Sequence, residues 1–263
     1  MNSICPELNY GARMARLVTN IATSDATSIT VRGRDLGGDL IGKCSYTEML
    51  YFLTVGRMPT AGETRVLDAC LVTLMEHGFT PAAVVSRLMA ASVPDQIQVS
   101  IAAGLLAVGS VNAGTMEGCA GLLAEGVEEK DWAQWCRRTV EDHQRRKKFV
   151  PGFGHAQHKP DDPRTPALFR VAAETGFDKR HVALLVQLSR EIDDSAGRHV
   201  TINATGAIAA LLLEIAVPAE IVRAIAVVSR AGGLVGHVME EARTASSRAL
   251  VTAAHERIPY EAP

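Results

Sequence analysis

The segment at residues 151–164, PGFGHAQHKPDDPR, places several chemically reactive side chains close together. The glycines before His155 leave backbone amides uncovered, so a ligand can approach closely. Asp162-Pro163-Arg164 forms a stiff turn that would present the Arg164 guanidinium from the start of a helix. That group is suited to bidentate carboxylate binding. Histidine beside such cations indicates a polyanionic ligand and proton transfer.

Two other interpretations of this segment stay open. Loops between helices also collect Gly, Pro, Asp and Lys, so the segment could be a solvated connection. His155 and His158 are three residues apart and two aspartates follow, which makes metal binding the rival chemistry. However, the pair is not part of an HExxH or Cys/His pattern, and Lys159 separates it from the carboxylates. We therefore expect no metal site.

Capping residues and helical spacing predict helices over most of the chain, and only Ser28–Arg32 is typical of a strand. Capping boxes at Ser45–Glu48 and Thr60–Glu63 mark two helix starts, and the second helix stops before Gly78. Thr80-Pro81 begins another helix. Further helices are expected at about residues 96–108, 116–126, 130–145, 165–175, 179–192, 205–216, 218–229 and 234–243.

Two of these segments, TGAIAALLLEI and IVRAIAVV, are apolar nearly all round. Such helices must be buried between other helices or against a second subunit. The polar interval at residues 147–164 is the clearest break along the chain. It predicts a boundary between a larger and a smaller all-α lobe.

The composition excludes several classes of protein. The 263 residues are 47% hydrophobic and 21% charged, with a formal net charge of -2, so no basic footprint for nucleic acid is present. The five cysteines are scattered without a CxxC pair, which argues against a disulfide framework or zinc ribbon. The longest apolar run, residues 207–213, is too short to span a membrane. We expect a cytoplasmic protein with no membrane partner.

The segment GFGHAQHKPDDPR resembles the signature of the citrate synthase family, Gly-Phe/Tyr-Gly-His followed by Asp-Pro-Arg. The form with His-Lys-Pro resembles the short citryl-CoA lyase-like branch, which is related to the C-terminal module of ATP-citrate lyase. Four further segments are similar to motifs of the family and extend the resemblance over about residues 28–260: VRGRDLGGDLIGKCSYTEMLYFLTVGRMPTAGE, GSVNAGTMEG, NATGAIAALLLEI and SRAGGLVGHVMEE.

The resemblance implies an all-α fold with a large and a small domain in an intertwined homodimer. The large domain would comprise about residues 1–146 and 233–263, and the small domain about residues 147–232. A coenzyme A thioester and a di- or tricarboxylate would be the ligands, and no metal or redox cofactor would be needed.

The resemblance also implies roles for individual residues. His155 matches the histidine that hydrogen-bonds the oxaloacetate carbonyl or the tertiary hydroxyl of citryl-CoA. Arg164 matches the arginine that holds a substrate carboxylate. His237 matches the histidine of the last motif, which is expected either at the substrate or as a packed, hydrogen-bonded structural residue. Coenzyme A is expected along Val150, Gly152, Phe153 and Gly154. Lys147 and Lys148 are expected near its phosphates, with a solvated charge run as the alternative.

Two positions depart from the family pattern. Asn112 stands where the family has a histidine that donates to the acetyl-CoA enolate; an amide can still donate to an oxyanion. Thr205 stands where the family has the aspartate that removes the acetyl α-proton, and loss of a general base costs roughly 10²–10⁴-fold in rate. No replacement base is assigned among the other aspartates.

The resemblance predicts cleavage of a citryl-CoA-type thioester to a 2-keto acid and acetyl-CoA. Condensation by a citrate or 2-methylcitrate synthase is the first alternative. A catalytically impaired binder of coenzyme A or carboxylates is the second.

Overall fold

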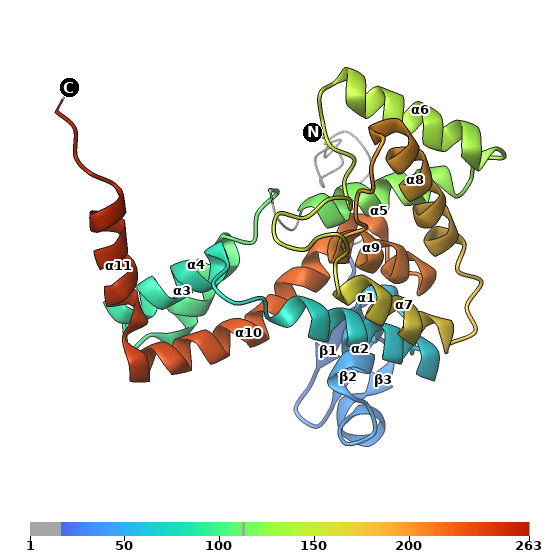
Figure 1. Ribbon diagram of the computed structural model, residues 1–263. Helices are drawn as coiled ribbons and strands as arrows, with labels where there is room; N and C mark the ends of the chain where they lie inside the picture. Colours follow the sequence, from blue (N-terminus) through green and yellow to red (C-terminus); the bar gives the residue numbers. More distant parts are fainter. Residues whose placement is uncertain (1–16, 112–113, 263) are drawn as a thin grey trace, which may run out of the picture. The chain divides into compact units, whose positions relative to one another are not determined.

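The structure is a computed structural model, and it describes residues 17–111 and 114–262 (Figure 1). The chain divides into two compact units, Met1–Met58 and Pro59–Pro263. Helices dominate both the element order and the second unit, which confirms the expected all-α fold class.

The first unit combines a small antiparallel sheet with one helix. Strands β1 (Ala22–Ser24), β2 (Ile29–Val31) and β3 (Arg34–Asp35) pair in that order, and a π-helical turn follows at Leu36–Leu40. Helix α1 (Tyr46–Val55) begins at the predicted capping box of Ser45 and Glu48. Val31, Leu40 and Phe52 form the core of this unit. The sequence predicted β2 but missed the strands on either side of it.

The second unit contains the remaining helices of the described part of the chain. Most lie where the sequence placed them, with ends shifted by a few residues: α2 (Ala61–Met75), α3 (Pro81–Ser92), α4 (Ile97–Leu106), α5 (Gly114–Gly126), α6 (Trp132–Arg145), α7 (Arg164–Ala173), α8 (Arg180–Ala196), α9 (Ala204–Glu214), α10 (Val222–Thr244) and α11 (Ser246–Arg257).

Helix α9 lies at the centre of the second unit. It packs against α2, α5, α7 and α8, and its residues 206–212 are all buried. The predicted burial of TGAIAALLLEI is therefore confirmed. A helix enclosed in this way holds its N-terminus in a fixed position relative to four neighbours, and the N-terminus of α9 forms part of the site described below.

Helix α10 corrects one prediction. Two helices were expected at about residues 218–229 and 234–243, but residues 222–244 form one continuous helix after a short 3₁₀ turn. The glycines between the two expected helices serve packing instead. A Cβ added at Gly233 would lie 2.0 Å from the Met75 carbonyl oxygen, so glycine lets α10 cross the end of α2 closely.

By length and apolar composition alone, residues 219–244 could cross a membrane. In the structure this segment packs against α2, α3 and α4, and the chain then continues into α11 beside α3 (Figure 1). Helix α11 was not predicted. It is only weakly amphipathic, and Ser247 is its one buried residue, so its sequence carries little helical signal.

Candidate active site

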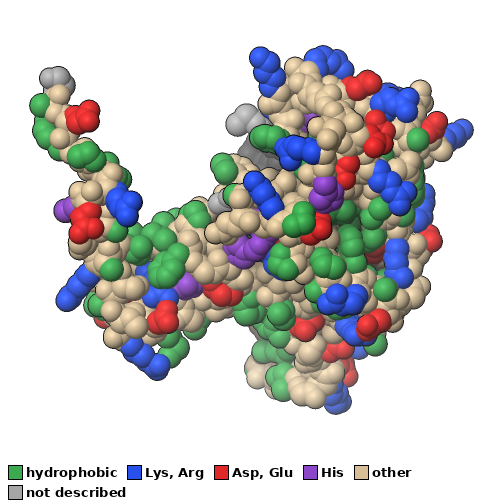
Figure 2. Space-filling view, in the orientation of Figure 1, with side chains coloured by type: hydrophobic (Ala, Val, Ile, Leu, Met, Phe, Trp, Pro, Cys, Tyr) green, Lys and Arg blue, Asp and Glu red, His purple; other side chains and the backbone are tan. Residues whose placement is uncertain are grey.

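A cavity of about 430 Å³ lies in the second unit. Its polar lining residues come from five parts of the chain: Thr73, His77, Thr80, Thr115, His155, Arg164, Asn203, Thr205 and Arg230. Among the described residues that line it, none is an aspartate or a glutamate. Figure 2 shows histidine atoms at the surface beside a hollow near the centre of the face drawn. The lining is suited to an anionic ligand.

The loop at residues 152–154 brings the histidine segment to the start of α9. Phe153 pairs with Ile202, and Gly154 N–H donates to the Thr201 carbonyl at 2.8 Å. Gly152 has a φ of 89°, and a Cβ there would lie 2.6 Å from Cys119 Sγ. Gly152 therefore serves close packing. At Gly154, in contrast, an added Cβ meets nothing within 4 Å, so its backbone borders open space.

Asp162 is the buried acceptor that fixes Arg164. Its carboxylate receives Arg164 Nε at 2.9 Å and Nη2 at 2.7 Å, and it also receives the Ala204 N–H at 2.9 Å. Burial alone would raise the pKa of Asp162, but these hydrogen bonds outweigh it and lower the pKa to about 2. One edge of the guanidinium is thus occupied. The opposite edge remains for a ligand, because an arginine has five N–H donors.

His155 is oriented by its own loop. Its Nδ1 accepts the Gln157 N–H at 3.1 Å and the His158 N–H at 3.0 Å. Burial, and next the His158 ring, lower the pKa of His155, so the neutral ring predominates near pH 7. With Nδ1 accepting, the ring proton must lie on Nε2.

The Nε2 atom of His155 is 3.5 Å from Arg164 Nη2. Both atoms are then donors and cannot bond each other. One ligand oxygen placed beside both atoms could accept a hydrogen bond from each.

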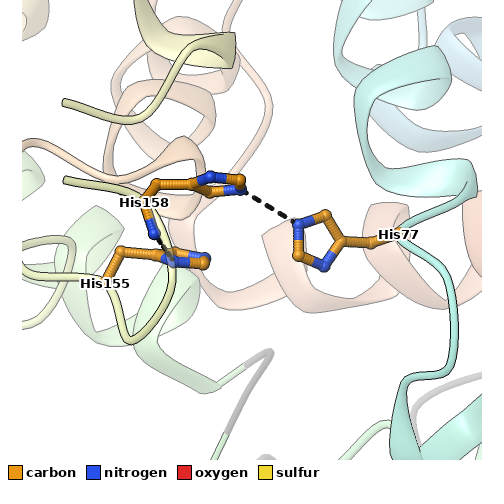
Figure 3. A group of neighbouring side chains, drawn as sticks. All are labelled: His77, His155 and His158. Atoms are coloured by element: carbon orange, nitrogen blue, oxygen red, sulfur yellow. Dashed lines mark hydrogen bonds between the residues drawn. The ribbon is translucent and has the colours of Figure 1, made fainter.

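Three histidines form a cluster at this position (Figure 3). His77, at the end of α2, and His158 have their Nε2 atoms 3.2 Å apart, and all three rings place a nitrogen within 4.8 Å of the others. Such spacing could accommodate a metal ion with nitrogen ligands at about 2.1 Å. His155, however, would need a bare Nε2 and a protonated Nδ1, which two backbone donors oppose. The donor chemistry therefore favours an anion over a cation.

The N-terminus of α9 supplies hydroxyl groups in place of a carboxylate. Thr205 Oγ1 donates to Asn203 Oδ1 at 2.6 Å and lies 3.1 Å from Thr115 Oγ1. Asn203 in turn donates to the Gly154 carbonyl at 2.8 Å. This network orders the start of α9 beside the histidine loop, but a hydroxyl cannot act as a general base near neutral pH. Asn112, the other departure from the family pattern, lies outside the described residues.

Other predicted residues lie away from the cavity lining. His237 is buried on α10, where its Nδ1 accepts Arg87 Nε at 2.9 Å. Lys147 and Lys148 are exposed where α6 ends, and Val150 is half-buried just beyond them. Phe153 is buried.

The sequence did not single out Arg230 or His77. Arg230 lines the cavity from α10 with 13% of its side chain exposed, and its buried Nη1 has no hydrogen-bond partner among the described residues. Arg230 stands in the quoted SRAGG motif, which is the signal that could have identified it. His77 follows α2 directly, and no motif marked it.

Comparisons with known proteins agree with this fold. Residues 59–251 match the family model of the citrate synthase C-terminal domain. This match covers most of the chain and falls within the second unit. The chain therefore belongs to the citrate synthase family.

Among solved structures, citryl-CoA lyase from Hydrogenobacter thermophilus is similar with a TM-score of 0.85 and 29% identity, over 95% of this chain and 96% of that one. ATP citrate lyase from Methanosaeta concilii, in complex with (3S)-citryl-CoA, shares the fold with a TM-score of 0.79 at 18% identity, over 96% of this chain and 42% of that one.

Curated relatives include 2-methylcitrate synthase of Shewanella oneidensis, 28% identical over 191 residues, which are 71% of this chain and 49% of that protein. Citrate/2-methylcitrate synthase of Bacillus subtilis is 25% identical over 202 residues, which are 75% and 52% of the two chains. The chain spans about half the length of these relatives.

Proposed function

We propose that the cavity binds the carboxylate-bearing end of a citryl-CoA-type thioester and cleaves it to a 2-keto acid and an acyl-CoA. The observation that supports this most is that His155 Nε2 and Arg164 Nη2 lie 3.5 Å apart, close enough for one ligand oxygen to accept from both. Asp162 and two backbone amides hold these donors in place before any ligand binds. Such preorganised donors stabilise a developing oxyanion.

The proposed reaction begins at the tertiary hydroxyl. Its proton leaves to a base, the C–C bond to the thioester methylene breaks, and the electron pair forms an acyl-CoA enolate while the hydroxyl carbon becomes a carbonyl. His155 and Arg164 would stabilise the intermediate alkoxide. The His77 ring is the lining group suited to accept the proton, since burial, and next the Arg164 charge, lower its pKa and keep it neutral. Solvent water would then protonate the enolate carbon, and the hydroxide that remains would take the proton from His77 and restore the neutral ring.

Arg230 would bind a second carboxylate. Its buried guanidinium carries an N–H group without a hydrogen-bond partner in the described structure, and an unsatisfied buried donor is costly. A ligand carboxylate would remove that cost. Coenzyme A would follow the open backbone at Gly154 toward Lys147 and Lys148.

The hydrogen bonding of the Thr205 hydroxyl supports a second candidate function, a protein that binds these ligands with little turnover. Its hydroxyl donates to Asn203, and among the described residues it has no titratable partner at hydrogen-bond distance. Threonine in place of a carboxylate should slow condensation in the synthase direction most, because abstraction of the acetyl α-proton is the difficult step of that reaction. We therefore rank cleavage above condensation.

A single set of assays separates these candidates. The protein is incubated with citryl-CoA, and separately with acetyl-CoA and oxaloacetate, while keto acid and free coenzyme A are followed. Cleavage without net condensation supports the lyase, and calorimetric binding of citrate and coenzyme A without turnover supports the binder. The His155→Ala variant should lose activity; a variant with full activity would contradict the assignment of the oxygen position.

We also propose that the chain forms a homodimer. Large apolar side chains on α4, α10 and α11 are exposed, including Leu106, Met239 and Val251. These side chains add no hydrophobic stabilisation while they are exposed to water, whereas a subunit interface would bury them. Light scattering coupled to size exclusion should give twice the mass of one chain.

A further inference from the structure

Glu76 lies at the point where α2 ends and contacts two residues that line the cavity, His77 and Arg230. Its Oε1 accepts the backbone N–H groups of His77 at 2.8 Å and of Gly78 at 2.5 Å. Its Oε2 lies 3.9 Å from Arg230 Nη1. Glu76 itself does not line the cavity. Because 47% of its side chain is exposed, these contacts, and not packing, determine where its carboxylate lies.

His237 contacts the same carboxylate oxygen from inside the protein. Arg87 Nε donates to His237 Nδ1 at 2.9 Å, which leaves the ring proton of the neutral histidine on Nε2. That Nε2 lies 3.0 Å from Glu76 Oε2. Arg87 is 2% exposed and is held in turn by Glu241 and Ser246. The ring of His237 is therefore fixed before it meets Glu76.

The face of α10 that meets the end of α2 explains how these groups assemble. Arg230, Gly233 and His237 are spaced by three and four residues, so they lie on one side of the helix. Gly233 allows the close crossing, and a Cβ there would approach Glu76 Oε2 to 3.1 Å as well as the backbone of Met75. One helical face thus carries a cavity residue, the crossing point and the contact to Glu76.

We propose that Glu76 is a positioning residue that sets the placement of His77 and Arg230, and that His237 acts through Glu76. His237 was expected at the substrate; here it influences the site from behind, without touching a ligand. The inference rests on the proposed function only for the identity of the ligand.

A purely electrostatic effect of Glu76 would have the opposite sign. Removing a carboxylate beside Arg230 makes the cavity more positive, which would tighten the binding of an anion. Loss of positioning weakens it, because hydrogen bonds to charged groups depend on alignment. The direction of the change in affinity therefore separates the two explanations.

The test compares Glu76→Gln and His237→Gln with Glu240→Gln as a matched control. Glu240 also contacts Arg87, but its side chain is 60% exposed, and the described structure has no hydrogen bond or ion pair between Glu240 and Glu76. Calorimetry measures the affinity for citrate and for coenzyme A. Amide hydrogen exchange of His77 and Gly78, followed by NMR without ligand, reports the backbone directly.

We expect Glu76→Gln and His237→Gln to weaken citrate binding about tenfold, with coenzyme A affinity unchanged and Glu240→Gln within twofold of the parent protein. His237→Gln should also accelerate exchange at His77 and Gly78 several-fold, while amides elsewhere keep their rates. Unchanged or tighter citrate binding by Glu76→Gln would overturn the inference, and so would unchanged exchange in His237→Gln. If the parent protein does not bind citrate, the proposed function fails and the exchange data alone decide the positioning.

Discussion

Asp162 offers the sharpest test of how the site is built. Its carboxylate is fully buried and accepts four hydrogen bonds, three from Arg164 and one from the Ala204 N–H. In Asp162→Asn one oxygen becomes an NH₂ group that faces donors, so about half of these bonds are lost. Removing one partner of a buried ion pair costs about 3–5 kcal/mol. Arg164 keeps 26% exposure and partial hydration, so we expect a loss of about 3 kcal/mol in the free energy of unfolding.

The contribution of Asp162 to the stability of the fold should depend on pH. The folded-state pKa of Asp162 is about 2, against a usual value of 3.8, because the hydrogen bonds from Arg164 and Ala204 outweigh the effect of burial. A depressed carboxyl pKa stabilises the fold above the unfolded value and loses that contribution as the pH falls. The shift corresponds to about 2 kcal/mol. About 1 kcal/mol of it should be gone by pH 3.

The measurement is urea unfolding of both proteins from pH 7 to pH 3, followed by circular dichroism. The difference in stability between them should narrow by about 1 kcal/mol at the acid end, since the variant has no carboxyl group to protonate. Asp161→Asn is the matched control, because its side chain is 66% exposed and, in the part of the chain that the structure describes, pairs with the half-exposed His199. It should stay within about 1 kcal/mol of the parent protein. A stability difference for Asp162→Asn that is below 1 kcal/mol at pH 7, or independent of pH, would refute the reasoning.

Three further variants test other parts of the structure. Thr205→Asp should raise the rate of citryl-CoA cleavage about 10²-fold or more by supplying an acid–base group, whereas Thr205→Asn should not; release of keto acid measures both. Gly233→Ala should lower the melting temperature, because its Cβ would lie 2.0 Å from the Met75 carbonyl oxygen, while Gly236→Ala meets nothing within 4 Å and should stabilise α10 by up to about 1 kcal/mol. Leu212→Ala, at a fully buried position of α9, should cost about 2–5 kcal/mol in urea unfolding.

Local signals in the sequence predicted most helices. The capping boxes at Ser45 and Thr60 form as expected, because hydroxyl and carboxylate exchange hydrogen bonds within one turn and need no tertiary context. Burial of α9 also followed from its composition. The strands β1 and β3 were missed because two or three mostly exposed residues leave no alternating pattern.

The single helix α10 shows where local reasoning fails. Gly232 and Gly233 suggest a break, since glycine lowers helix stability by about 1 kcal/mol. The end of α2, 158 residues earlier in the chain, is what requires glycine at Gly233. A tertiary contact over that separation leaves no trace in the local pattern, and the break was therefore predicted wrongly.

The candidate site was also predictable only where its residues are close together in the sequence. His155 and Arg164 stand nine residues apart in one loop, so their types and spacing indicated a shared role. His77 and Arg230 reach the same cavity from distant helices, and only the packing of α2 against α10 brings them there. The domain boundaries, the role of Asn112 and the coenzyme A contacts stay predictions.

The arrangement around Asp162 and Thr205 suggests why binding and chemistry can be separated in this protein. Asp162 receives donors from both α7 and the start of α9, so the half of the site proposed to bind a carboxylate is part of the fold itself. Thr205 lies one residue beyond Ala204, whose N–H makes that contact, and its hydroxyl joins Asn203 and Thr115 without changing the backbone. A substitution at Thr205 can therefore alter the chemistry while the oxygen position at His155 and Arg164 persists. Substitution of Asp162 should instead disturb both the oxygen position and the chemistry. Variants at Asp162 and at Thr205 are therefore expected to differ in which properties they change as well as in the size of the change.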